Sequence, residues 1–217
     1  IYAQSEEDKN RFLALGAKYI EVVGNIKLAG EITQTKEYIK PKCEVIIAGS
    51  THDTEEESVL KAFVEYRKQV KAKLIVVPRH PERFDSVYEL MKEYASIHKL
   101  SLSRFSDHEN FEADMLLVDA MGELNNMYAI SDIAIVGGAF KEKVGGHNPL
   151  EPANFGCKII TGKHFHDQRE LYKYVHHVQY VERDEIHKAL IASKDLPPSM
   201  VEETINLETV INKIKES

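Results

Sequence analysis

Short runs of apolar, largely β-branched residues alternate with amphipathic helical patterns along almost the whole chain. Such alternation is typical of an α/β fold, in which a parallel sheet carries helices on both of its faces. Most runs are continuously apolar, as expected for strands that are buried on both sides. We therefore predict one doubly wound parallel sheet. The expected strands are Tyr19–Val23, Glu44–Gly49, Leu74–Val77, Lys99–Ser103, Met115–Val118, Asp132–Val136, Lys158–Thr161 and Val178–Val181.

Capping residues and apolar spacings predict the helices between these strands. The first is expected to have Ser5 as N-cap, Asp8 at its third position and Gly16 as terminator. The second is expected to begin near Thr54, with Glu57 completing a capping box. The apolar stripe of this second helix is Leu60, Phe63, Val64 and Val70. A third helix is predicted from Phe84, Val87, Met91 and Tyr94, and the last helix from Leu207, Ile211 and Ile214. Between them, Asp167 and Glu170 are expected to form a capping pair ahead of a helix with Leu171 and Val175.

Bulk properties narrow the class of protein. The 217 residues, 43% hydrophobic and 29% charged, suit one soluble globular domain over residues 1–217. A net charge of −7 disfavours a broad nucleic-acid-binding surface. The two cysteines, Cys43 and Cys157, form no CxxC motif and favour a reducing compartment. We find no apolar run of the roughly 20 residues that span a bilayer. Because the chain begins at Ile1, within a motif, we expect it to be part of a longer protein.

The segment from Val136 to Gly156 carries the strongest functional pattern. An apolar strand leads through two glycine pairs, Gly137-Gly138 and Gly145-Gly146, into a helix start with Asn148, Pro149 and Glu151. α/β proteins build sites for anionic or nucleotide ligands in this way, at the carboxyl edge of a sheet. A carboxylate in the first helical turn there is suited to accept ribose hydroxyls. The alternative is a glutamate that only complements the helix dipole.

Three other strand ends carry unusual residues, and the carboxyl ends of parallel strands share one edge. Ser50 and Thr51 follow the second expected strand; they suit an oxygen-rich ligand or a helix cap. Arg79 is held out of the helix by the prolines on either side and suits bidentate contact with phosphate or carboxylate, unless it is an ordinary turn arginine. Gly122 opens a strand-to-helix turn, whose free N–H groups suit an anion. An ordinary connection, with Glu123 complementing the helix dipole, is the alternative.

Several common motifs are absent from the sequence. There is no GxGxxG, P-loop or GxSxG pattern, which leaves nicotinamide, ATP-hydrolysis and serine-hydrolase functions without support. HExxH and Cys/His zinc spacings are also absent, so no metal site and no cofactor are predicted. Pairs such as His164/His166 and His176/His177 are interpreted as surface or core histidines.

Taken in order, these motifs resemble those of the Kdo transferases of lipopolysaccharide assembly, which move 3-deoxy-D-manno-oct-2-ulosonic acid (Kdo) from CMP-Kdo to lipid A precursor. The matching segments span residues 3 to about 165, namely AQSEEDKNRFLALGA, VVGNIK, AGSTHDTEEE, VPRHPERF, DAMGELNNMYAISDIAIVGGAF and GGHNPLEPANFG. The resemblance implies the C-terminal, Rossmann-like, donor-binding half of a GT-B glycosyltransferase. The N-terminal acceptor domain is expected to lie outside this chain.

The resemblance also implies site residues. Contacts to the CMP moiety are expected from Pro78, Arg79, Met121, Gly122, Glu123, Asn148, Pro149, Leu150 and Glu151. Ser50, Thr51, Gly145 and Gly146 also match the family and are expected to line the donor pocket. The family's catalytic base is a glutamate of the other domain, so no catalytic residue is expected in this chain.

The chemistry implied by the resemblance is inverting sugar transfer to lipid IVA, without a metal. The chain alone is expected to bind CMP-Kdo and to be soluble and inactive. The whole protein is expected at the cytoplasmic face of a Gram-negative inner membrane, attached peripherally through the other domain. Two alternatives remain open at this point: the donor domain of another GT-B transferase or of a UDP-sugar epimerase, and a non-catalytic nucleotide-binding module.

Overall fold

A computed structural model describes residues 1–24, 32–108, 111–202, 211–212 and 215 of the chain. They fall into two compact units, one made of Ile1–Ile32 with Glu202–Ser217, the other of Thr33–Val201. Each unit is described by itself. The single domain expected over residues 1–217 stays a prediction.

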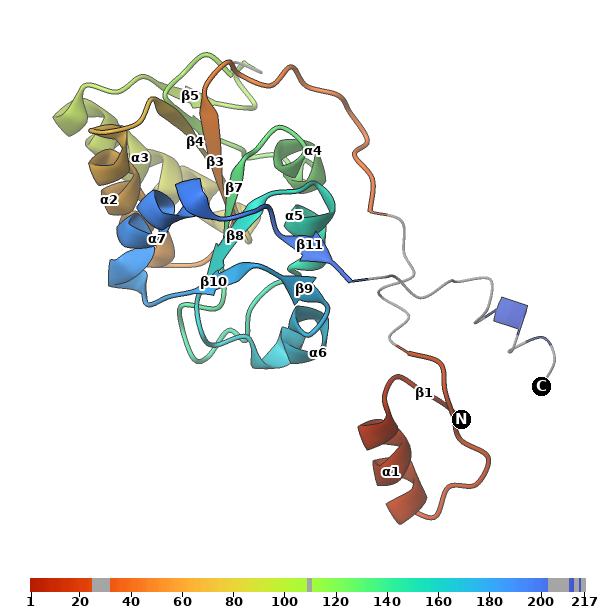
Figure 1. The fold of residues 1–217 in the computed structure, drawn as a ribbon. Coiled ribbons are helices and arrows are strands. Elements are labelled where there is room, and N and C mark those ends of the chain that lie inside the picture. The colour runs from red at the N-terminus through yellow and green to blue at the C-terminus, as the bar shows by residue number, and fades with distance from the viewer. Residues whose placement is uncertain (25–31, 109–110, 203–210, 213–214, 216–217) are drawn as a thin grey trace. The chain divides into compact units, whose positions relative to one another are not determined.

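The larger unit is built on a seven-stranded, all-parallel sheet (Figure 1). The strands lie in the order β10-β8-β7-β3-β4-β6-β5. This confirms the predicted doubly wound α/β fold, because the chain builds outward from β3 in one direction and then returns to β7 on its other side. The strands are β3 (Glu44–Thr51), β4 (Ala72–Pro78), β5 (Leu102–Arg104), β6 (Met115–Leu117), β7 (Ile133–Val136), β8 (Lys158–Thr161) and β10 (Val178–Tyr180).

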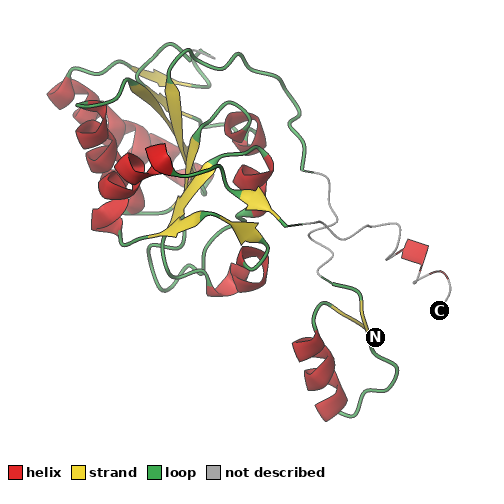
Figure 2. Cartoon of the chain, viewed as in Figure 1, coloured by secondary structure: helices red, strands yellow, loops and turns green. Residues whose placement is uncertain are grey.

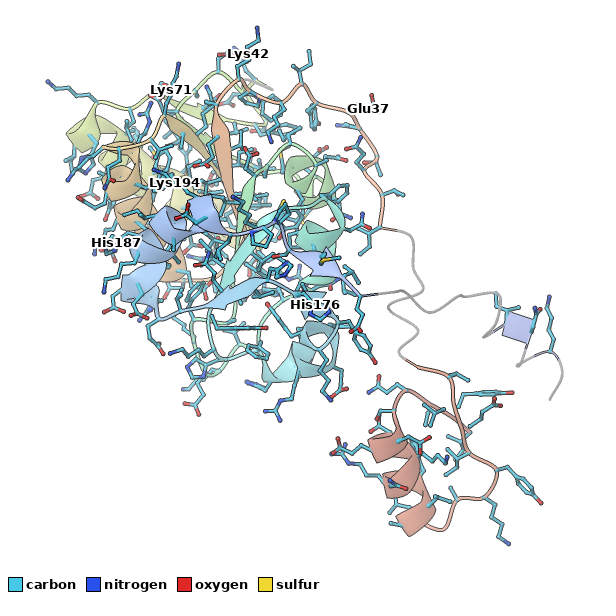
Figure 3. All side chains as sticks on the ribbon, viewed as in Figure 1. Glu37, Lys42, Lys71, His176, His187 and Lys194 are labelled. Carbon is cyan, nitrogen blue, oxygen red and sulfur yellow. The ribbon has the colours of Figure 1, made fainter. Side chains whose placement is uncertain are left out.

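Helices cover both faces of the sheet, so that the unit has three layers (Figure 2). On one face α2 (Glu55–Arg67), α3 (Phe84–His98) and α7 (Ile186–Ala192) bury a core that includes Phe63, Met91 and Leu190. On the other face α4 (Leu124–Tyr128) and α5 (Leu150–Asn154) lie against a second core, which includes Met127 and Tyr128. Figure 3 shows the side chains that fill these layers. Because the central strands contribute side chains to both cores, apolar and polar residues do not alternate along them.

The larger unit also contains an antiparallel pair of short strands, β9 (Val175–His176) and β11 (Met200–Val201), and the short helix α6 (Arg169–Tyr172). Among the described residues of the larger unit, short 3-10 turns also connect elements: η2 (Pro81–Arg83), η3 (His166–Gln168), η4 (Arg183–Glu185) and η5 (Ser193–Asp195). Within the described part of the chain, no helix has both the length and the apolar character needed to cross a membrane.

The smaller unit contains β1 (Tyr2–Ala3), α1 (Glu6–Ala14) and β2 (Glu21–Val22). The hydroxyl of Ser5 accepts a hydrogen bond from the Asp8 N–H at 3.1 Å, which confirms the predicted N-cap of the first helix. The strand expected over Tyr19–Val23 was wrongly assigned to the main sheet. Its residues 21–22 pair in parallel with β1 instead, which makes a separate two-stranded sheet.

Local helix signals were less accurate than the strand signals. Helix α2 begins at Glu55 as expected, but Thr54 has a φ of 70° and forms no side-chain cap, while Glu57 bonds Lys61. The capping box predicted there is therefore wrong.

The predicted Asp167–Glu170 capping pair is also wrong, because Asp167 belongs to η3 and α6 has Gln168 as its N-cap. Val175, expected on the same helix, starts strand β9. Most of the last predicted helix, including Leu207 and Ile214, lies outside the described residues.

Candidate functional site

The four polar motifs lie at the carboxyl ends of four neighbouring strands, β7, β3, β4 and β6. Ser50 and Thr51 end β3, Arg79 follows β4, Gly122 follows β6, and Asn148 to Glu151 follow the loop after β7. The prediction that these strand ends share one edge is confirmed. Neighbouring strands are about 4.8 Å apart, so the four motifs extend over about 14 Å. The edge includes the junction of β3 and β7, where the direction of strand addition reverses and where α/β proteins bind ligands.

Glycines allow β3 and β7 to approach closely at this junction. The Gly137 N–H donates to the Gly49 carbonyl at 2.9 Å. A Cβ on Gly137 would lie 2.5 Å from the Ser50 carbonyl oxygen, and a Cβ on Gly49 would lie 2.3 Å from the Tyr128 hydroxyl. Ser50 itself has a φ of 54° and sits where the β3–β4 register shifts, so it forms a bulge. Bulges and left-handed residues occur frequently beside functional sites, where they redirect the following side chain.

A buried carboxylate, Glu55, occupies the anion position of the first glycine pair. Both of its carboxylate oxygens accept the Gly138 N–H at 3.0 Å, and Oε2 also accepts the His52 N–H at 2.9 Å. Burial raises the pKa of Glu55, although these backbone hydrogen bonds oppose the shift. The N–H groups of the first glycine pair are therefore both bound within the protein, that of Gly138 to the Glu55 carboxylate and that of Gly137 to the Gly49 carbonyl.

Arg79 is an exposed cation at this edge. Its N–H donates to the Thr51 carbonyl at 3.0 Å, which fixes its backbone, and Pro81 starts the turn η2 two residues later. Its side chain is exposed, and within the described residues its guanidinium forms no hydrogen bond or ion pair. Arg83, by contrast, is engaged: both of its terminal nitrogens bond the buried carboxylate of Glu56. The two arginines of the same motif thus have different tasks.

In the turn after β6, two residues are exposed and the next one is buried and held by hydrogen bonds. Gly122 has a φ of 84° and open space around it, and the Met121 side chain is 67% exposed. Glu123 is buried instead, and its carboxylate accepts from Lys36 Nζ at 2.9 Å, Tyr38 Oη at 3.0 Å and Asn126 Nδ2 at 2.8 Å. Burial acts to raise the pKa of Glu123, but these hydrogen bonds outweigh it and leave the pKa lowered. Only the backbone of Glu123 therefore remains for a ligand.

The loop after β7 is closed by its own contacts before α5 begins. Asn148 Oδ1 accepts the Leu150 N–H at 3.0 Å, and its Nδ2 donates to Glu151 Oε1 at 3.2 Å. Helix α5 begins at Leu150, so Pro149 directly precedes the helix and is not its first residue. Burial raises the pKa of Glu151, while the Asn148 bond and the positive charge of Arg79 oppose the shift. The charge of Arg79 therefore acts on the Glu151 carboxylate.

The second glycine pair also packs within the chain. Gly145 and Gly146 have φ values of 87° and 84°. A Cβ on Gly145 would lie 2.5 Å from the Asp167 carboxylate, and one on Gly146 would lie 2.9 Å from Phe165. The Gly146 N–H donates to the Gly138 carbonyl at 2.9 Å, so the two glycine pairs hold the loop together.

Three histidines follow three of these strand ends and lie together. His52 comes after β3, His80 after β4 and His147 after the second glycine pair. The Nε2 atoms of His52 and His147 are 2.7 Å apart, their ring centroids are 5.0 Å apart, and the ring planes are nearly parallel, at an angle of 9°. The His80 ring meets that of His52 edge-on at 5.2 Å. Burial lowers the pKa of His52, and it lowers the pKa of His147 to about 4, with further contributions from the neighbouring cations.

The depressed pKa of His147 should make the unliganded protein less stable in mild acid. The ring has a pKa near 6.5 when unfolded and about 4 when folded, so its contribution to stability is fully present above pH 6.5 and is lost as the pH falls towards 4. Because the ring is partly exposed, we expect a loss of about 1–2 kcal/mol. Urea unfolding between pH 7 and pH 4.5 measures it. In the variant His147→Gln the free energy of unfolding should depend less on pH. The variant His98→Gln, which replaces an exposed histidine at the far end of α3, should keep the pH dependence of the original chain.

Two buried polar atoms near the edge are without partners in the described part of the chain, Thr51 Oγ1 and Asn125 Oδ1. Thr51 is fully buried at the end of β3, and Asn125 lies in the first turn of α4. An unsatisfied buried polar group costs about 1–3 kcal/mol. A ligand that supplies a hydrogen-bond partner to either atom would recover that cost.

The sequence patterns gave no role to Glu55 or to the three histidines, although each histidine stands within one of the strand-end motifs. A signal for Glu55 existed in the run of three glutamates directly after Thr54, because one of three adjacent glutamates at a helix start must point inward. The signal for His52, His80 and His147 was that each directly follows a predicted site residue. Neither signal names a partner, because the contacts form only when separate strands meet.

Comparisons with known proteins add to this geometry. The chain is 38% identical over 176 residues to the 3-deoxy-D-manno-octulosonic acid transferase of Aquifex aeolicus, which covers 81% of this chain and 47% of that protein. It is 39% identical over 194 residues to the transferase of the same name from Haemophilus influenzae, covering 83% and 44% of the two chains. The chain thus spans about half the length of these curated relatives. No family model matches it.

A solved structure is also similar to this chain. The C-terminal CMP-Kdo binding domain of WaaA from Acinetobacter baumannii superposes with a TM-score of 0.59 at 30% sequence identity. The match covers 70% of this chain and 82% of that domain. The Rossmann-like fold of a GT-B C-terminal domain, expected from the sequence, is confirmed.

Proposed function

Since the chain belongs to the family of 3-deoxy-D-manno-octulosonic acid (Kdo) transferases, we propose that it binds the donor CMP-Kdo at the carboxyl edge of its sheet. The observation that carries this proposal is Arg79, an exposed guanidinium without a partner among the described residues, at the centre of four convergent motifs. A guanidinium in this setting suits the phosphate of a nucleotide. The similar Acinetobacter domain is described as binding CMP-Kdo, which supports the same ligand here.

In this proposal the sugar nucleotide lies across the ends of β7, β3, β4 and β6. Arg79 binds the phosphate, and the backbone of Met121 to Glu123 is beside it. Glu151 is suited to accept ribose hydroxyls, because it is half-buried and one of its oxygens is held by Asn148. The segment Asn148 to Glu151 and the backbone of Pro78 complete the CMP contacts. Ser50, Thr51, Gly145 and Gly146 border the donor pocket, the two glycines through the shape that they give the loop.

The proposed reaction is inverting transfer of Kdo. An acceptor hydroxyl loses its proton to a base outside this chain and attacks the anomeric carbon, while the bond from that carbon to the phosphate oxygen of CMP breaks. Arg79 stabilises the negative charge that develops on the departing CMP. The chain itself orients the donor, and we propose that it does not transfer sugar alone.

The acceptor and the location belong to the same proposal. We propose that the whole protein acts on lipid IVA at the cytoplasmic face of the inner membrane. The acceptor contacts would come from a second domain of the kind that makes up the other half of the curated relatives' length.

The proposal is tested by titrating the chain with CMP and with UMP in a calorimeter. We expect CMP to bind in the micromolar to millimolar range and UMP to bind more weakly, and UDP to have no advantage over CMP. A lack of heat with millimolar CMP would contradict the proposal. Tighter binding of UDP than of CMP would indicate a different sugar-nucleotide transferase or an epimerase.

A further inference from the structure

We infer that His52 and His147, together with His80, form an anion subsite that takes up one proton from solvent when the anionic part of the donor binds. The inference rests on the proposed function, since the anion is supplied by CMP-Kdo. The group bound is an anionic oxygen, either of the phosphate or of the sugar carboxylate. The three histidines thereby become ligand-binding residues of the site.

The placement of the histidines supports a common task. They follow three strands that lie side by side: His52 directly follows β3, His80 comes after Arg79 behind β4, and His147 lies in the loop after β7. His52 and His147 come from positions 95 residues apart in the sequence, yet they share a hydrogen bond of 2.7 Å between their Nε2 atoms. Both rings are partly accessible, and His80 is exposed. A ligand at this edge can therefore reach the cluster.

The pair has a definite proton count when no ligand is bound. Only one proton fits between two Nε2 atoms 2.7 Å apart, so one ring donates its Nε2–H and the other accepts. In the neutral pair the donating ring keeps a free lone pair on Nδ1, for which no partner exists within the described residues. A second proton would go to that Nδ1. It would create an imidazolium with an N–H donor for an anionic oxygen, and the Nε2–Nε2 bond would remain.

The charges around the pair explain why this proton is absent without a ligand. The acidic groups beside the pair are already engaged: Glu56 by Arg83, Glu55 by backbone N–H groups, and Asp53 by Arg83 and Lys141. Glu82 Oε1 lies 3.9 Å from Nδ1 of the exposed His80 and is not among the groups whose charges act on His52 or His147. The remaining neighbours are cationic or can become so, and they disfavour a further positive charge on the pair. The groups whose charges act on His52 or His147 are Arg79, His80, Arg83 and Glu56.

A bound anion changes this balance. It supplies the counter-charge that the unliganded site lacks, so it favours the protonated pair and raises its pKa. A group whose pKa is higher in the complex than in the free protein takes up a proton on binding, and affinity then falls about tenfold per pH unit between the two pKa values. The fully buried hydroxyl of Thr51, directly before His52, has no partner within the described part of the chain.

The number of protons taken up is measured by calorimetry. The chain is titrated with CMP-Kdo and with CMP at pH 6.5 in buffers that differ in their enthalpy of ionisation. The slope of the observed heat against that enthalpy gives the proton count. CMP-Kdo keeps a constant charge from pH 5 to 8, whereas CMP is a phosphomonoester with a second pKa near 6. The double variant with His52→Gln and His147→Gln gives the share of the protons that belongs to CMP itself.

We expect an uptake approaching one proton with CMP-Kdo and a tenfold loss of affinity per unit between about pH 6 and 7.5. Uptake with CMP as well assigns the anion to the phosphate, and uptake with CMP-Kdo alone assigns it to the carboxylate. His147→Gln should lower the proton count to near zero and flatten the pH profile, while His98→Gln should leave both unchanged. Gln keeps a neutral hydrogen-bonding side chain, and circular dichroism checks that each variant is folded.

Binding of CMP-Kdo without proton uptake would overturn this inference and leave the proposed function intact. So would a His147→Gln variant that keeps the proton count and pH profile of the original chain. No binding of either ligand by the folded chain would overturn the proposed function and this inference with it.

Discussion

Replacing Arg79 by alanine is expected to weaken CMP binding by about 10- to 150-fold, which corresponds to the loss of a charged hydrogen bond of about 1.5–3 kcal/mol. The fold should not change, because the Arg79 side chain is exposed and within the described residues forms no ion pair. The backbone bond from its N–H to Thr51 persists in the variant. Calorimetric titration with CMP, with the melting temperature as a check on folding, measures the effect.

Two further variants make the result specific. Arg79→Lys keeps the charge but loses the planar fork, so it should recover only part of the affinity. Arg169→Ala removes an exposed arginine on α6 and should leave CMP binding unchanged. If Arg79→Ala binds CMP as tightly as the original chain does, the phosphate is held elsewhere and the proposed site is wrong.

Replacing Glu55 by alanine is expected to lower the free energy of unfolding by about 2–6 kcal/mol, because two buried N–H groups each lose an acceptor at about 1–3 kcal/mol. The side chain is 1% exposed, and its carboxylate holds the N–H groups of Gly138 and His52 at the junction of β3 and β7. Without it these donors are left buried and unpaired, and a cavity remains behind them. Urea unfolding monitored by circular dichroism measures the loss.

The same helix offers a matched control. Glu57 is two residues further along α2, is exposed, and forms an ion pair with Lys61 in the next turn. Glu57→Ala should therefore cost only about 0.3–0.5 kcal/mol. Equal stability of the two variants would show that Glu55 is not needed to hold the glycine loop.

The fold was predictable because its signals are local. Most strands of the sheet are short apolar runs, such as Ile133–Val136, that can be recognised without knowledge of their neighbours. Tyr19–Val23 shows the limit of this reasoning, because an apolar run does not specify its partner and this one pairs with Tyr2–Ala3. Helix caps were harder to predict, since Thr54 is the right residue type for a cap but adopts a left-handed backbone conformation.

The candidate site was predictable in outline only. Arg79 and Gly122 stand out because prolines and glycines mark strand ends, and parallel strands bring those ends to one edge. The partners of Glu123 and Glu55 could not be predicted, because Lys36 and Gly138 are 87 and 83 residues away in sequence. The sequence does not distinguish a carboxylate that binds a ligand from one that accepts hydrogen bonds within the protein. They differ only in what the fold places beside them.

The central position of β3 has a consequence for how the chain acquires its structure. Strand β3 comes first in the sheet along the chain, but it pairs on one side with β7, which comes much later. The hydrogen bond from the Val45 N–H to the Asp132 carboxylate joins residues that are 87 positions apart in the sequence. Closing so long a loop costs conformational entropy before the strand pairing stabilises it, so we expect folding to be slow. During synthesis on the ribosome one flank of β3 stays uncovered until the second half of the sheet emerges. The junction of β3 and β7 is therefore among the last parts of the sheet to form, and a ligand that needs this junction cannot assist the earlier steps.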